Sequence, residues 1–139
     1  IATVIADQGR LRQLLHNLLT NATEALEGRR GGEIVVSTRL ATRGGTDVAE
    51  ITVEDDGPGF QRDLIGQVFD PYVTTKAKGT GLGLAIVRKI VEEHGGHIEA
   101  ENRAEGGARV RIDLPLSELT RPVAVQRSER KTETRRERA

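Results

Sequence analysis

Two asparagines in the first part of the chain have the chemistry and the spacing of metal ligands. Asn17 and Asn21 are four residues apart, so on a helix they lie one turn apart on the same face. Asn21 adjoins Leu18 and Ala22, which belong to an apolar stripe where an unpaired amide would be costly. Amide oxygens suit a hard cation and its water shell. On this pattern alone, a surface asparagine is an equally good interpretation of Asn21.

A turn rich in acid and glycine, residues 55–59, follows an alternating run of apolar and polar residues. Asp-Gly and Pro-Gly pairs readily form ordinary turns, so this segment alone is a weak signal. Asp55 supplies a carboxylate, which accepts hydrogen bonds but does not donate them when it is ionised. Gly57 and Gly59 let the backbone come close to a bound molecule. The segment is therefore a candidate contact for an exocyclic amine.

A second glycine-rich block, residues 79–84, is the strongest local signal. Gly79, Gly81 and Gly83 stand at every second position immediately before a helical pattern. Free backbone N–H groups at the positive end of a helix form an anion site. The block lacks the Gly-Lys-Ser/Thr of a Walker loop and the glycine spacing of a dinucleotide fingerprint. A flexible linker fits poorly, because Leu82 and Leu84 alternate with the glycines.

A short segment, residues 69–76, lies between the two glycine blocks and reads Phe-Asp-Pro-Tyr-Val-Thr-Thr-Lys. With it, the order and spacing of the blocks resemble the N, G1, F and G2 boxes of the ATP-binding domain of sensor histidine kinases. That domain belongs to the GHKL ATPase superfamily. The resemblance covers residues 1–116. It implies an enzyme, a protein histidine kinase, that uses ATP and Mg²⁺.

The resemblance assigns a role to each block. It implies that Asn21 is the magnesium ligand that carries the triphosphate, and that Asp55 accepts a hydrogen bond from the adenine amine. The cofactor-binding residues that it implies are Asn21, Asp55, Gly57, Gly59, Tyr72, Thr75, Lys76, Gly79, Thr80, Gly81, Leu82, Gly83 and Leu84.

The residue at Asn17 separates two chemistries within the superfamily, and Asn17 is the candidate catalytic residue. Members that hydrolyse ATP carry a Glu there that activates water, whereas an amide cannot take a proton. Asn17 therefore favours phosphoryl transfer to another protein. The resemblance implies that the acceptor histidine lies on a separate helical dimerisation domain, from which a response regulator takes the phosphoryl group. His16 has a structural role in this interpretation. Glu24 and the short Thr-Thr-Lys lid resemble the nitrogen-regulation NtrY and NtrB kinases.

The hydrophobic pattern predicts the elements that position these blocks. Apolar residues recur at steps of three and four over 8–26 and again after Gly83 to residue 94, which predicts two helices. Alternating runs predict a strand at 1–5, a short helix at 64–69, and hairpins pairing 33–40 with 48–53 and 97–101 with 108–114. The resemblance implies an α+β fold: a two-layer α/β sandwich of the Bergerat type, with a mixed β-sheet and helices on one face. We expect residues 1–116 to form the ATP-binding catalytic domain, 73–78 to be mobile, and 117–139 to be a charged, disordered tail.

The composition excludes several classes of function. The 139 residues carry no net charge, which argues against general nucleic-acid binding. There is no cysteine, so disulfides and thiol catalysis are excluded, and no apolar run approaches the roughly 20 residues of a membrane span. The chain begins without Met, so we expect a fragment of a longer parent that could be membrane-anchored. We also expect this fragment to be cytoplasmic and monomeric. Two alternatives stay open: a nucleotide-binding regulatory module without kinase activity, and another GHKL ATPase or anti-sigma-factor serine kinase.

Overall fold

The computed structural model describes residues 4–73 and 82–116. Both predicted hairpins and both long helices are present, and the short predicted helix is a single 3-10 turn. The strand expected at 1–5 is not formed by Val4 or Ile5, which have no regular structure, and the rest of it lies outside the described residues. The elements are α1 (Gln8–Ala25), β1 (Ile34–Arg43), β2 (Thr46–Asp55), η1 (Ile65–Gln67), α2 (Gly83–Glu93), β3 (His97–Asn102) and β4 (Ala108–Pro115).

Two other expectations fall mostly or wholly outside the described residues: the mobile segment at 73–78, of which only Val73 is described, and the disordered tail at 117–139. Within the described part, neither helix combines the length and the apolar character that a membrane crossing requires.

The four strands form one sheet in the order β1-β2-β4-β3. All three pairings are antiparallel, so the expectation of a mixed sheet is wrong for the described residues. The reason is the connectivity. β1 and β2 are joined by the tight turn at Gly44 and Gly45, and β3 and β4 by a short turn, and strands joined by such turns must run antiparallel. The long connection from β2 to β3 then brings β4 beside β2, again antiparallel.

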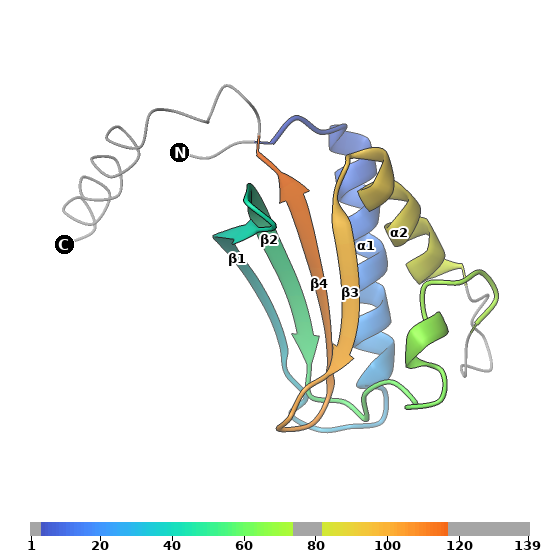
Figure 1. The fold of residues 1–139 in the computed structure, drawn as a ribbon. Helices are drawn as coiled ribbons and strands as arrows, with labels where there is room; N and C mark the ends of the chain where they lie inside the picture. The colour runs from blue at the N-terminus through green and yellow to red at the C-terminus, as the bar shows by residue number, and fades with distance from the viewer. Residues whose placement is uncertain (1–3, 74–81, 117–139) are drawn as a thin grey trace.

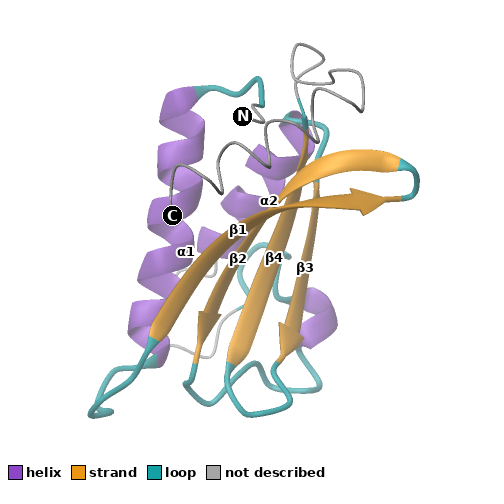
Figure 2. Ribbon diagram, turned by 90° about the vertical axis from the view of Figure 1, so that its left-hand side faces the viewer, coloured by secondary structure: helices purple, strands orange, loops and turns teal. Residues whose placement is uncertain are grey.

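Both helices cover the same face of this sheet, which confirms the predicted two-layer α+β arrangement (Figures 1 and 2). Asp7 caps α1, because its Oδ1 accepts a hydrogen bond from the backbone N–H of Arg10 at 3.0 Å. Within the predicted apolar stripe of α1, Leu14, Leu18 and Ala22 are buried, whereas Leu15 and Leu19 are exposed. Burial of these side chains, together with apolar side chains of α2 and of the sheet, supplies the hydrophobic stabilisation of the domain. The buried core residues are Leu14, Leu18, Ala22, Val53, Val87, Ile90, Val91, Ile98, Val110, Ile112 and Leu114.

The opposite face of the sheet carries ion pairs between neighbouring strands. Arg39 Nε donates to Glu50 at 2.8 Å, and Arg111 donates to Glu99 on β3 at 2.7 Å. One antiparallel face can stay open to water in this way. The side-chain hydrogen bond from Arg39 is the main cause that holds the pKa of Glu50 below its ordinary 4.5. The ion pairs therefore belong to the outer face and not to the candidate site.

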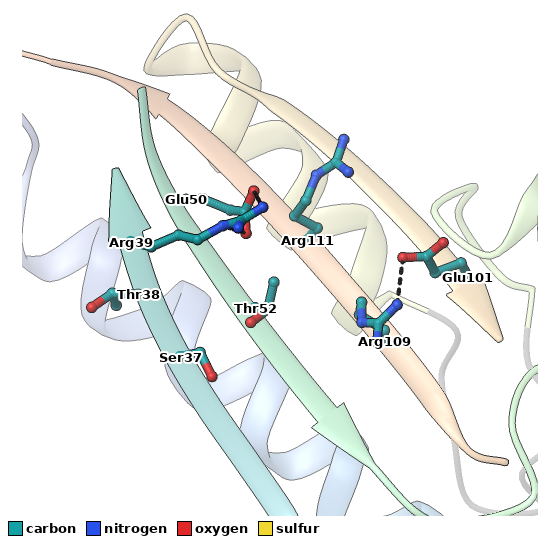
Figure 3. A pocket seen from close by; sticks show the side chains of 8 residues that line it. All are labelled: Ser37, Thr38, Arg39, Glu50, Thr52, Glu101, Arg109 and Arg111. Atoms are coloured by element: carbon teal, nitrogen blue, oxygen red, sulfur yellow. Dashed lines mark hydrogen bonds and ion pairs between the residues drawn. The ribbon is translucent and has the colours of Figure 1, made fainter. Parts of the chain in front are cut away.

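A cavity of about 360 Å³ lies on this outer face, as Figure 3 shows. None of the predicted site residues lines it. Its arginines already have carboxylate partners: Arg39 pairs with Glu50, and Arg109 with Glu101. The lining residues are Ser37, Thr38, Arg39, Glu50, Thr52, Glu101, Arg109 and Arg111.

Candidate functional site

The carboxylate of Asp55 is held inside the domain at the end of β2. Asp55 is the last residue of that strand and is only 4% exposed. Its Oδ1 accepts hydrogen bonds from the backbone N–H groups of Gly57 at 2.9 Å and Ala108 at 3.4 Å. A buried carboxylate without such donors would be strongly unfavourable. Within the described part of the chain, no hydrogen bond falls on Oδ2, so this oxygen remains an acceptor for a ligand.

The predicted glycines of this turn are required by close packing inside the protein. A Cβ on Gly57 would lie 2.9 Å from the carbonyl oxygen of Ala25, at the end of α1. Gly59 has φ of 81°, in the left-handed region that favours glycine. A Cβ there would lie 2.7 Å from Asn102 Oδ1. The turn therefore packs against both the helix layer and the sheet layer. It lies at the edge of the domain where α1 and β2 end and where the β3–β4 connection turns (Figure 1).

The end of β3 and the β3–β4 connection hold the turn in place by hydrogen bonds and close packing. The sequence analysis assigned no role to the residues of this connection. Asn102 accepts a hydrogen bond from the backbone N–H of Phe60 at 2.7 Å and donates one to the Phe60 carbonyl oxygen at 2.9 Å. Arg103 donates to the backbone oxygen of Asp55 at 3.0 Å. Gly107 passes so close that a Cβ would lie 1.9 Å from that same oxygen. One local signal was available: an asparagine at the end of a strand, where asparagine is uncommon.

Asn17 of α1 lies beside the start of α2, and Asn21 follows it one turn later on the same helix. Asn17 and Asn21 are both half-buried. Asn17 Nδ2 donates to the carbonyl oxygen of Gly83, the first residue of α2, at 3.2 Å. That bond uses the amide N–H of Asn17 and leaves Oδ1 as an acceptor. The structure thus brings the first and the last of the predicted blocks together, although they are 66 residues apart in sequence.

The start of α2 presents the positive end of a helix, which is the setting of an anion site. Leu82 is the N-cap residue and provides no side-chain cap, because leucine carries no acceptor. Gly83 is exposed, and Leu84 packs against the core. The first N–H groups of a helix have no partner within the helix, and they lie at its positive end.

The donor set fits a magnesium ion carried by phosphates better than one held by protein alone. Among the described residues, no group of three or more His, Cys, Asp or Glu side chains could hold a metal. Mg²⁺ commonly keeps several waters and takes few protein ligands in addition to phosphate oxygens. The amide oxygens of Asn17 and Asn21 on α1 would supply one or two such protein ligands.

Other predicted site residues are not brought into this group. Tyr72 is 76% exposed, with φ of 67°, a left-handed conformation that is rare for a bulky residue. Asp70, from the same predicted box, pairs with Arg88 of α2 at 3.2 Å. His16 is exposed on α1. Five predicted contacts lie outside the described residues: Thr75, Lys76, Gly79, Thr80 and Gly81.

Comparisons with known proteins identify the family of the chain. The family described as "Histidine kinase-, DNA gyrase B-, and HSP90-like ATPase" matches residues 6–118. The chain is 43% identical over 115 residues to sensor protein FixL of Bradyrhizobium diazoefficiens, covering 83% of this chain and 22% of that protein. It is also 43% identical over 115 residues to a putative sensor histidine kinase NtrY-like of Rickettsia conorii, covering 83% and 18%.

A solved structure extends the agreement to the fold. The catalytic domain of histidine kinase ThkA matches with a TM-score of 0.67 and 38% identity, over 81% of this chain and 70% of that one. The chain spans about a fifth of the length of the two curated relatives.

Proposed function

Because the chain belongs to the histidine kinase-, DNA gyrase B- and HSP90-like ATPase family, we propose that it binds Mg-ATP at the edge where β2, α1 and the start of α2 meet. Its relatives include sensor histidine kinases, and it is an ATP-binding catalytic domain of their kind. Its fold is the Bergerat fold that the sequence predicted. In the parent protein, it would transfer the γ-phosphoryl group of ATP to a histidine on a separate dimerisation domain.

The observation that carries this proposal is the carboxylate of Asp55. Its Oδ1 is occupied by backbone donors, which leaves Oδ2 for the ligand. An ionised carboxylate only accepts hydrogen bonds, so it pairs with the amine of adenine and is mismatched to the carbonyl of guanine. Gly57 and Gly59 would bring the backbone of the turn close to the base.

The phosphates would lie between α1 and the start of α2. Asn21 would ligate the magnesium ion, which when bound neutralises phosphate charge and orients the γ-phosphoryl group. The backbone N–H groups at Leu82, Gly83 and Leu84 would bind phosphate oxygens. We further propose phosphate contacts from Thr75, Lys76, Gly79, Thr80 and Gly81, and a stacking or covering contact from Tyr72.

Asn17 directs the chemistry away from hydrolysis. Its amide cannot accept a proton from water, and its N–H is already used to hold Gly83. The residues of this chain would then bind and orient the nucleotide and leave the nucleophile to the dimerisation domain. Positioning and electrostatic stabilisation supply most of the catalysis in phosphoryl transfer.

The wider setting follows from the relatives. We propose that the parent kinase is cytoplasmic in this part, that the isolated domain is monomeric, and that a response regulator receives the phosphoryl group from the dimerisation domain. The nitrogen-regulation type rests on Glu24 in the sequence Asn-Ala-Thr-Glu-Ala and on the NtrY-like relative. The absence of net charge disfavours a nucleic-acid partner.

Titration calorimetry with Mg-ATP and Mg-GTP tests the nucleotide site. We expect ATP to bind at least about tenfold more tightly, because one mismatched polar pair at a buried carboxylate has a cost of that order. Asp55→Asn should remove most of this preference. Asp56→Asn is the matched control, because Asp56 Oδ1 accepts a hydrogen bond from the Glu33 backbone N–H, which an amide oxygen can still do. Equal affinity of the unchanged domain for GTP would refute the assignment.

A labelling experiment tests the phosphoryl transfer. With γ-labelled ATP, the isolated domain should neither label itself nor release phosphate appreciably. Addition of the parent's dimerisation helices should produce acid-labile phosphohistidine on those helices. Rapid phosphate release by the isolated domain would favour the ATPase alternative. Binding without any transfer to the helices would favour a regulatory module.

A further inference from the structure

We propose that Asn102 is a positioning residue for nucleotide binding, acting through the backbone of Phe60 to hold the turn that carries Asp55. This inference rests on the proposed function of that turn and adds a residue from the far end of the chain. Asn102 ends β3 and is 42 residues away from Phe60 in sequence. It is outside every block by which the site was recognised.

The contact is a clamp of two hydrogen bonds on the backbone N–H and C=O of one residue, Phe60. Asn102 Oδ1 accepts from Phe60 N at 2.7 Å, and Asn102 Nδ2 donates to Phe60 O at 2.9 Å. A carboxamide is the smallest side chain that can donate and accept at once in this geometry. An ionised aspartate of the same shape could keep the first bond, but it would place a negative oxygen against the Phe60 carbonyl.

The turn runs from Asp55, its near end, to Phe60, its far end. The clamp fixes the far end, and the β3–β4 connection with the start of β4 fixes the near end. At the near end, Ala108 N–H and Arg103 donate to the side chain and the backbone of Asp55. At the far end, Asn102 holds Phe60 and its Oδ1 lies against Gly59. Between Asp55 and Gly59, the β3–β4 side holds the turn at both ends. The conformation of the turn is therefore set before any ligand binds.

Such preorganisation acts on affinity as well as on stability. Ordering a backbone that is mobile in the free protein costs conformational entropy, and a site that must be ordered on binding loses that free energy from its affinity. Without the clamp, residues 57–60 would have to be ordered by the nucleotide. The loss should fall on the base, which meets this turn, and not on the phosphates, which meet α2.

Asn102→Asp is the sharpest test, because it changes one donor into an acceptor and keeps the shape. Calorimetry should show that the affinities for Mg-ATP and for adenosine fall by the same factor, about tenfold. Amide exchange at Phe60 should become faster. The control is Glu99→Gln, on the same strand but facing outward, where it pairs with Arg111. It should leave both affinities within about twofold.

Each result has one meaning. Adenosine affinity within twofold of the unchanged domain, in a folded Asn102→Asp variant, overturns the proposal, as does a loss for ATP with none for adenosine. If that variant fails to fold, Asn102→Ser makes the same comparison, since a hydroxyl can keep at most part of the clamp. Absence of nucleotide binding by the unchanged domain is a separate result: it refutes the proposed function itself and removes the basis of the clamp's role.

Discussion

Gly107 offers the most direct test of how closely the β3–β4 connection must approach the turn. A Cβ at this position would lie 1.9 Å from the backbone oxygen of Asp55 and 2.8 Å from the Cα of Asp56. Real Cβ atoms essentially never come within 3.0 Å of another heavy atom, so Gly107→Ala must separate the two segments by about 1.1 Å (3.0 − 1.9). The obstructing atoms are backbone, which cannot swing aside as a side chain can.

The neighbouring Gly106 supplies a control with nearly the same backbone conformation. Gly106 has φ of 102° and Gly107 has φ of 97°, and a Cβ on Gly106 would have no atom within 4 Å. The left-handed conformation alone costs about 1–3 kcal/mol for a residue with a side chain. Overpacking adds about 1–3 kcal/mol, so Gly107→Ala should cost about 2–6 kcal/mol in total.

Urea unfolding and calorimetry measure the two effects. Gly107→Ala should lower the free energy of unfolding by about 1–3 kcal/mol more than Gly106→Ala does. It should also raise the Kd for Mg-ATP at least about tenfold, because the separation moves Asp55 away from its donors. Gly106→Ala should leave the Kd within about twofold. If the two alanine variants were equally stable, the close approach of Gly107 to Asp55 would be wrong.

Three further predictions concern other contacts. Asn17→Ala should destabilise the domain by about 0.5–1.5 kcal/mol, the usual cost of one hydrogen bond, and amide exchange at the start of α2 should become faster because Gly83 O loses its donor. Asp7→Ala should cost about 1 kcal/mol in urea unfolding through loss of the α1 cap. Because folding lowers the pKa of Glu50, ionised Glu50 stabilises the domain fully above about pH 4.5 and progressively less below it. The advantage of the unchanged domain over Glu50→Gln should therefore shrink as pH falls below 4.5; an advantage independent of pH would contradict this.

The sequence predicted well what local patterns determine. The spacing of Leu14, Leu18 and Ala22 identified the buried face of α1, because helical periodicity depends only on neighbours along the chain. The hairpin of β1 and β2 followed from alternation around Gly44 and Gly45. The blocks at Asn17 and at Gly83 were recognised separately, and the structure joins them by a hydrogen bond.

The residues that sequence reasoning missed depend on contacts between distant segments. Asn102 and Gly107 matter because of atoms on Phe60 and Asp55, and nothing in their own neighbourhood specifies those partners. The antiparallel sheet was also missed for this reason: the pairing of β2 with β4 is set by a long connection, and its direction is not encoded in the pattern of either strand. The ion pairs of the outer face likewise depend on the strand register, which places Glu50 beside Arg39 and Glu99 beside Arg111.

The two sides of the site are held by different parts of the fold, and this has a consequence for what nucleotide binding can do. The turn at Asp55 is fixed to the sheet through Asn102 and Gly107, whereas the start of α2 is fixed to α1 through Asn17. A nucleotide that contacts both sides would connect the sheet layer to the helix layer at this edge. Among the contacts described above, only the approach of Gly57 to the end of α1 links the two layers there. If the turn at Asp55 is held in this conformation before binding, as we propose, the energy of the base contacts is available for affinity and discrimination. Any rearrangement that couples binding to phosphoryl transfer should therefore arise on the α2 side, where we propose that the phosphates bind.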